Sequence, residues 1–149
     1  MKKFLPLMVV AAVAAVIVFF PTEQKRIRKV MRGAVEAVMR EDVDGLMEHI
    51  SFNYRDAHGG SYLLVKKKTE AAFRRYNSLD ISADIVDLRV EGSAAAVYLK
   101  VSIIASDGAN RGYILGDAGK ARDVRVDLEK SPYEWKIINA EGVADRAHG

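Results

Sequence analysis

The sequence has no cysteine among its 149 residues, and this absence excludes several kinds of chemistry. Disulfide bonds, a thiol nucleophile and thiolate metal sites all need a cysteine side chain. The three histidines, His49, His58 and His148, do not have the spacing of metal-ligand motifs. We therefore expect neither a metal site nor a cofactor, while the absence of cysteine leaves the cellular compartment open.

The body of the chain also lacks an excess of positive charge, although the whole protein is basic with a net charge of +3. Residues 1–32 hold seven of the 23 basic residues and one of the 20 acidic ones. The remaining chain therefore has 16 basic and 19 acidic residues, a net charge of −3. A nucleic-acid-binding domain would need a basic face on its folded body, so we expect no nucleic-acid partner.

Long hydrophobic runs are absent except at the amino terminus, where Phe4 to Phe20 carries no charge. Seventeen residues make about 25 Å of helix, which is near the lower limit for crossing a bilayer. We expect residues 1–21 to be an uncleaved membrane anchor, because the most hydrophobic part, "VIVFF", follows the small alanines instead of preceding them. A cleaved signal peptide and a buried helix of a soluble domain are the alternatives.

The charges around this run bear on where the protein resides. Two lysines precede it, as in bacterial export signals, whereas a larger cluster from Lys25 to Arg32 follows it. We expect a single-pass protein of the bacterial inner membrane with a periplasmic domain, with the opposite orientation as the alternative. On either side, the cluster could contact anionic lipid headgroups.

From Thr22 onward the apolar residues recur with helical spacing. Thr22, Asp42 and Ser61 are N-cap residues of three predicted helices, over residues 23–39, 43–50 and 62–76. The inward positions of the first helix are predicted to be Ile27, Val30, Met31, Ala34, Val35, Val38 and Met39. Those of the third helix are Tyr62, Val65, Thr69, Ala72, Phe73 and Tyr76.

After Asn77 the period changes from 3.6 to 2, which indicates strands. Alternation is clear over residues 82–92, 94–105, 123–130 and 134–142, with turn signals at Glu91-Gly92, Asp107-Gly108 and Ser131-Pro132. Helices followed by consecutive antiparallel strands predict an α+β fold, with three helices packed on a curved sheet. We expect this domain to span residues 22–143 and the tail, residues 144–149, to be disordered.

The "EDVDGLMEHIS-x-x-YRD" segment between two helices, followed by strands and a final "EWKIINAEG" strand, resembles the nuclear-transport-factor-2-like superfamily. This superfamily includes ketosteroid isomerase and the SnoaL-like cyclases, and the chain looks most like its uncharacterised membrane-anchored bacterial members. The resemblance implies a cone-shaped fold with an internal pocket and frequent dimers, here through the sheet. It does not imply an activity.

The catalytic residues of the isomerases are only partly matched. Their aspartate base falls on His58 or, with one small gap, on Asp56. Their first-helix tyrosine, which donates to the oxyanion, falls on Ala34, and the first helix has no tyrosine. The residues that we expect to line a ligand pocket are Tyr54, Asp56, His58, Tyr76, Tyr98 and Trp135, although Tyr98 alternates onto the face opposite the apolar row of its strand.

The segment from Tyr54 to Ser61 has a structural interpretation that we favour over catalysis. Asp56 can accept backbone N–H bonds in a turn, and Gly59 and Gly60 can adopt positive φ values. Tyr54 and Phe52 would then pack against the core.

The remaining motif, "GDAGKA" from Gly116 to Ala121, has shorter glycine spacing than a phosphate-binding loop and lacks its serine or threonine.

Taken together, these observations lead us to expect a membrane-tethered, non-catalytic domain that binds a small ligand, a peptide or a partner protein through the cone pocket or the sheet face. One alternative is a small enzyme doing proton transfer with Asp56 or His58 as base, and another is a purely structural dimerisation module.

Overall fold

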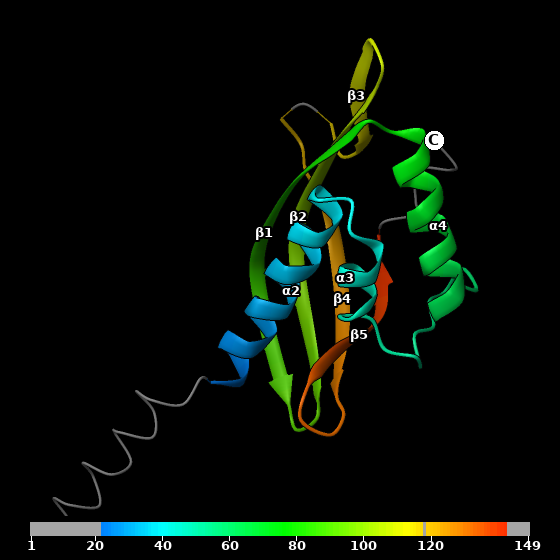
Figure 1. Cartoon of the computed structure of the whole chain (residues 1–149). Helices are drawn as coiled ribbons and strands as arrows, with labels where there is room; N and C mark the ends of the chain where they lie inside the picture. The colour runs from blue at the N-terminus through cyan, green and yellow to red at the C-terminus, as the bar shows by residue number, and fades with distance from the viewer. Residues whose placement is uncertain (1–21, 118, 143–149) are drawn as a thin grey trace, which may run out of the picture.

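The computed structural model describes residues 22–117 and 119–142, so the expectations for residues 1–21 and 144–149 lie outside it. Its helices are α2 (Glu23–Met39), α3 (Val43–Met47) and α4 (Tyr62–Arg75). Helices α2 and α3 cover one face of an antiparallel sheet, and α4 lies on the other side of α3 from α2 (Figure 1). The predicted α+β architecture of three helices and an antiparallel sheet is confirmed. Within these residues, no helix is long and apolar enough to cross a membrane.

The sheet has five strands in the order β1-β2-β4-β5, and β3 pairs with β2. The strands are β1 (Ser78–Glu91), β2 (Ala94–Asp107), β3 (Asn110–Leu115), β4 (Arg122–Lys130) and β5 (Trp135–Glu141). Strand β1 pairs along one side of β2, and β4 and β3 share the other side. The glycines of the first two predicted turns, Gly92 and Gly108, both have φ of 61°, which a glycine adopts without strain.

Strand β3 and the first part of β1 are not predicted by the sequence pattern. Residues Asn110 to Ile114 of β3 are all exposed, so no apolar alternation marks the strand. It forms because the turn at Gly108 folds the chain back along the end of β2, where backbone hydrogen bonds are available. The result is a long β2–β3 hairpin that extends beyond the rest of the sheet (Figure 1).

The three predicted N-caps are confirmed. The Thr22 hydroxyl accepts a hydrogen bond from the Lys25 N–H at 3.3 Å, and the Asp42 carboxylate accepts one from the Gly45 N–H at 2.9 Å. The Ser61 hydroxyl accepts the N–H of Leu64 at 3.3 Å. Each cap satisfies a backbone donor that the first turn of a helix leaves without a partner.

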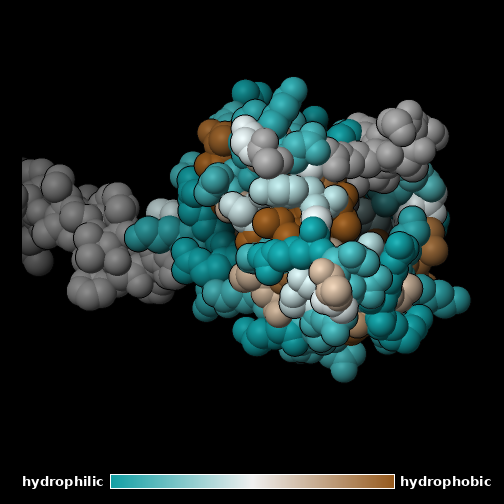
Figure 2. All heavy atoms as spheres, turned by 90° about the horizontal axis from the view of Figure 1, so that it is seen from above, coloured by the Kyte–Doolittle hydropathy of each residue, from teal (hydrophilic) through white to brown (hydrophobic). Residues whose placement is uncertain are grey.

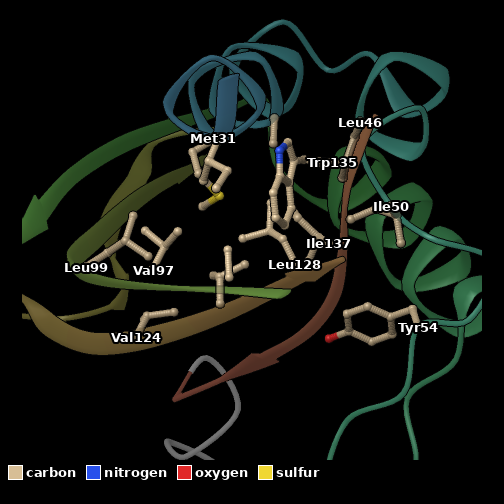
Figure 3. Close-up of a cluster of buried hydrophobic side chains, with 14 of the residues drawn as sticks. Met31, Leu46, Ile50, Tyr54, Val97, Leu99, Val124, Leu128, Trp135 and Ile137 are labelled. Atoms are coloured by element: carbon tan, nitrogen blue, oxygen red, sulfur yellow. The ribbon is translucent and has the colours of Figure 1, made fainter. Parts of the chain in front are cut away.

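The core lies between α2, α3 and the inward face of the sheet (Figure 3). Along β2 and β4 the predicted alternation is confirmed, with Val97, Leu99, Val124 and Leu128 buried. Trp135 on β5 is 3% exposed, as its place in the last strand predicts, and its indole N–H donates to the Glu23 carboxylate at 2.5 Å. This bond joins the start of α2 to the sheet.

The second helix is shorter than predicted, because Ile50 leaves it to bridge to β5. The Ser51 N–H donates to the Ile137 carbonyl at 2.9 Å, and the Ile137 N–H donates to the His49 carbonyl at 2.8 Å. Through these bonds, the segment that follows α3 pairs with the outer edge of β5. Backbone pairing therefore outweighs the helical pattern at this point.

Two predictions about packing are wrong. Phe52 is 84% exposed, and its ring centroid lies 4.7 Å from that of Tyr62. The inward face of α2 is rotated relative to the predicted one, so that Ala37 is buried while Met39, a predicted inward position, is 42% exposed. The inward face of α4 lies where it is predicted, although its positions are only half-buried and no residue of this helix is fully buried.

Candidate functional site

The six residues expected to line one pocket do not converge. Tyr54 and Asp56 lie together in the α3–α4 loop, beside the exposed His58. Tyr98 points outward from β2, as its alternation predicts, and the half-buried Tyr76 follows α4. Trp135 lies in the core at the start of β5, and core side chains fill the interior around it (Figure 3).

The α3–α4 loop holds the Asp56 carboxylate with three hydrogen bonds. Oδ2 accepts the Tyr54 hydroxyl at 3.0 Å, and Oδ1 accepts the N–H groups of His58 at 3.0 Å and Gly60 at 2.8 Å. Gly59 has a φ of 79°, as predicted for this turn. Gly60 does not have a positive φ. A glycine is needed here because a Cβ would lie 2.2 Å from the Asp56 carboxylate.

These bonds decide the protonation state of Asp56. Burial, the largest effect, raises the pKa of this carboxyl, but the hydrogen bonds from Gly60, Tyr54 and His58 together lower it below its usual value. Burial also raises the pKa of Tyr54, and the hydrogen bond to Asp56 raises it further. The pair therefore exists as an ionised carboxylate and a neutral phenol at neutral pH, as a structural turn requires.

A second site lies on the outward face of the sheet, in a groove of about 600 Å³ that we call the sheet-face groove. Its lining includes Arg55, Arg89, Ala96, Tyr98, Arg125, Asp127 and Asn139. Small alanines on β2 make the hollow, and longer side chains on β1, β4 and β5 form its walls.

Tyr98 is the centre of this groove. The guanidinium of Arg89 on β1 lies 5.5 Å from its ring centroid, and that of Arg125 on β4 lies 5.6 Å from it. Asp87 accepts a hydrogen bond from Arg89 at 3.0 Å, and Asp127 accepts one from Arg125 at 3.0 Å. The hydrogen bond to Asp127 is also the main reason why the pKa of Arg125 is raised. The result is a flat aromatic platform whose flanking cations are already held in place.

Asn139 on β5 adds an unsatisfied polar atom to the groove. Its Nδ2 donates to Asp127 Oδ2 and to Glu141 Oε1, both at 3.0 Å. The opposite amide orientation would place its oxygen against two carboxylates, so the observed one is favoured. Asn139 Oδ1 is then buried without a hydrogen-bond partner among the described residues.

Sequence reasoning identified Tyr98 but missed Arg89, Arg125, Asp127 and Asn139. For Arg89, Arg125 and Asp127 the available signal was the outward parity of their positions along two alternating strands. Asn139 shares the parity of the buried Trp135 and Ile137, and a bulge in the β4–β5 pairing brings it beside Asp127. Parity alone does not say which strands are neighbours, and the grouping depends on the strand order.

Comparison with solved structures identifies the fold. The chain resembles a nuclear-transport-factor-2-like protein with a cystatin-like fold from Novosphingobium aromaticivorans, at 12% identity and a TM-score of 0.63, covering 90% of this chain and 86% of that one. It also resembles a provisionally assigned scytalone dehydratase from the same organism, at 13% identity and a TM-score of 0.66, covering 79% and 80% of the two chains. A conserved protein from Planctomyces limnophilus is 14% identical, with a TM-score of 0.64 and coverage of 79% and 92%.

These likenesses show that the chain has the nuclear-transport-factor-2-like fold, and at such low identity they show the fold alone. No protein-family profile and no curated protein matches the sequence.

Proposed function

We propose that this chain is a non-catalytic binding domain, tethered to the bacterial inner membrane by residues 4–20, that binds a peptide or a partner protein in the sheet-face groove. The observation that carries the proposal is the hydrogen bonding of the Asp56 carboxylate within its own loop. Its carboxylate is held by Tyr54, His58 and Gly60 as an ionised turn residue, rather than as a base in front of a substrate.

The chemistry of the groove favours a polypeptide as the ligand. A tyrosine with flanking arginines is the combination most often found at the centre of protein interfaces. A second copy of this chain is one such ligand, and a homodimer through the sheet remains our expectation. A periplasmic position for the domain remains part of the proposal.

Native mass spectrometry of the full-length protein, extracted from membranes in detergent, tests the groove. We expect a bound peptide, protein or second copy on the wild type, and a several-fold lower bound fraction for Tyr98→Ala and for Arg125→Ala. Ser82→Ala is the matched control, because Ser82 is exposed on β1 outside the groove. If the double variant Tyr98→Ala/Arg125→Ala retains the whole bound species, the groove is not the binding site.

An enzyme is the second candidate, because the similar structures include a provisionally assigned dehydratase and because Tyr54 and Asp56 form a phenol–carboxylate pair. In this alternative Asp56 or His58 is the base for a proton transfer. Asp56→Asn would then abolish turnover of a substrate while leaving stability unchanged. A screen of cyclic ketones and polyketide-like substrates, with wild type and Asp56→Asn in parallel, distinguishes the two functions.

A further inference from the structure

The most exposed large hydrophobic side chains gather at one end of the domain. Phe52, Tyr133 and Leu63 are 84%, 81% and 65% exposed. They lie on the α3–α4 loop, the β4–β5 turn and the first turn of α4, all at the lower end of the molecule in Figure 1. Exposure of single apolar residues is common, but three such residues on separate segments at one end form a surface that needs an explanation.

Two hollows connect these loops into one surface. Arg26, Lys29, Tyr133 and Lys136 line the first, and Phe52, Tyr62, Lys66 and Lys136 line the second. Lys136 belongs to both hollows, so the surface is continuous from α2 to α4. We call it the basal face and define it by Lys29, Phe52, Lys66, Tyr133 and Lys136, together with Leu63, which lines a neighbouring hollow with Phe52 and Tyr62.

The basal face combines aromatic and apolar side chains with lysines. Lys29 and Lys66 have no ion-pair partner among the described residues, whereas Lys136 lies 3.5 Å from Glu134 and donates to the Glu48 carbonyl. Acidic groups also border it, namely Glu48, Glu134, Asp44 and Glu129. Glu129 is occupied by hydrogen bonds from Ser51 and Asn53.

The same end of the domain is where the chain arrives from its apolar amino-terminal segment. Glu23 at the start of α2 contacts Lys130 at 3.0 Å and Trp135 at 2.5 Å, so the β4–β5 turn lies beside the start of this helix. Pro21 and Thr22 separate the apolar run from Glu23. Three residue steps from Phe20 to Glu23 span at most about 11 Å, so a bilayer that holds residues 4–20 would lie close to the basal face.

We propose that the basal face docks on the anionic lipid surface of the membrane that holds residues 4–20. Phe52, Leu63 and Tyr133 enter the interface between headgroups and acyl chains, where aromatic and apolar side chains are favoured. Lys29 and Lys66 contact lipid phosphates, which neutralise charges that have no partner within the described domain. This inference rests on the membrane tether in the proposed function, and it assigns the orientation of the domain relative to the bilayer.

Single-cysteine labelling tests the orientation cleanly, because the native chain has no cysteine. Full-length Phe52→Cys and Tyr133→Cys would carry an environment-sensitive fluorophore in phosphatidylcholine vesicles with and without phosphatidylglycerol. Ala109→Cys is the control, since Ala109 is exposed in the β2–β3 turn at the opposite end of the domain. We expect labels at 52 and 133 to brighten several-fold with phosphatidylglycerol and to be quenched by lipid-borne quenchers, while the label at 109 does neither.

Vesicle flotation of the same samples separates failure of the docking from failure of the tether. If the chain floats with both vesicle types while labels at 52 and 133 behave like the label at 109, the docking is wrong and the tether stands. If the chain floats only with phosphatidylglycerol vesicles, docking is supported and the tether is wrong. If the chain floats with neither, both are wrong. Brightening that follows protein concentration instead of lipid composition would mean contact between copies and would also overturn the docking.

A matched pair of charge variants tests the lysines. Lys29→Gln/Lys66→Gln should remove most of the phosphatidylglycerol-dependent brightening at position 52. Arg40→Gln/Arg74→Gln removes the same charge from the opposite ends of the same two helices and should leave it unchanged. Equal losses in both variants would indicate unspecific attraction of a basic protein and would overturn the assignment of this face. Circular dichroism confirms that both variants are folded.

Discussion

Helices α2 and α4 differ in packing far more than their sequences suggest. Both are amphipathic and capped, and both carry exposed basic residues. Yet α2 buries Ile27, Met31, Ala34 and Ala37 against the sheet, while α4 buries none of its residues fully. Helix α2 contacts α3, β1 and β5, whereas the main neighbour of α4 is the short helix α3. An apolar stripe makes a helix able to pack, but the surface available to it decides how much area is buried.

Seen from the end at which β3 lies, hydrophobic side chains occupy the centre of the molecule inside a ring of hydrophilic ones (Figure 2). The apolar face of α4, including Val65, Ala72, Phe73 and Tyr76, is half-buried. Helix α4 is therefore the part of the helical layer that can move with the smallest loss of buried area, and α2 is the fixed part.

The largest effect should come from removing the side chain that holds α2 to the sheet. Trp135→Ala should lower the free energy of unfolding by about 3–5 kcal/mol, because it leaves a cavity and removes the partner of Glu23. Urea denaturation and the thermal midpoint measure this loss. An unchanged midpoint would mean that the last strand does not place Trp135 in the core.

A direct comparison of the two helices should give the next largest difference. Ile27 is fully buried on α2, and Leu64 is half-buried on α4. Ile27→Ala should cost about 2–5 kcal/mol, as expected for a buried aliphatic side chain, whereas Leu64→Ala should cost less than about half of that. Chemical denaturation of the two variants under the same conditions is the measurement. Equal losses would show that α4 is packed as firmly as α2.

The turn that leads into α4 should show smaller effects. Asp56→Ala should cost about 1 kcal/mol, the usual value of a lost capping interaction. Asp56→Asn should be milder, because the amide oxygen still accepts backbone N–H bonds. His58→Ala should change stability by less than about 0.5 kcal/mol, since His58 is exposed. A loss with His58→Ala larger than that with Asp56→Ala would contradict this account of the turn.

The smallest effect should be the pH dependence that Asp56 contributes. Its folded-state pKa lies below its usual value of 3.8, so the ionised carboxylate stabilises the fold above that value. The stabilisation is lost as the pH falls through the folded-state pKa, and Asp56→Asn should therefore flatten the acid side of the stability curve. Carboxyl-carbon NMR measures the pKa directly. A result above about 6 would indicate a desolvated base and favour the enzyme.

Much of the turn at Asp56 could be predicted from sequence, because it is local. The carboxylate, the glycines and the Ser61 cap lie within six residues, so their hydrogen bonds follow from short-range geometry. The sheet-face groove could be predicted only in part. The alternation along β2 predicts that Tyr98 points outward. Arg89 and Arg125, however, reach its ring from two other strands.

By itself, the sequence determined where the three helices begin and which side of β2 and β4 is apolar, because caps and periodicity act over a few residues. The tertiary structure alone decided which strands lie beside β2, and hence which outward side chains surround Tyr98. It also left Phe52 exposed and α4 half-packed, because the core is already filled by α2, α3 and the sheet. Burial depends on the area that distant segments leave free, and this area is not encoded in any local pattern.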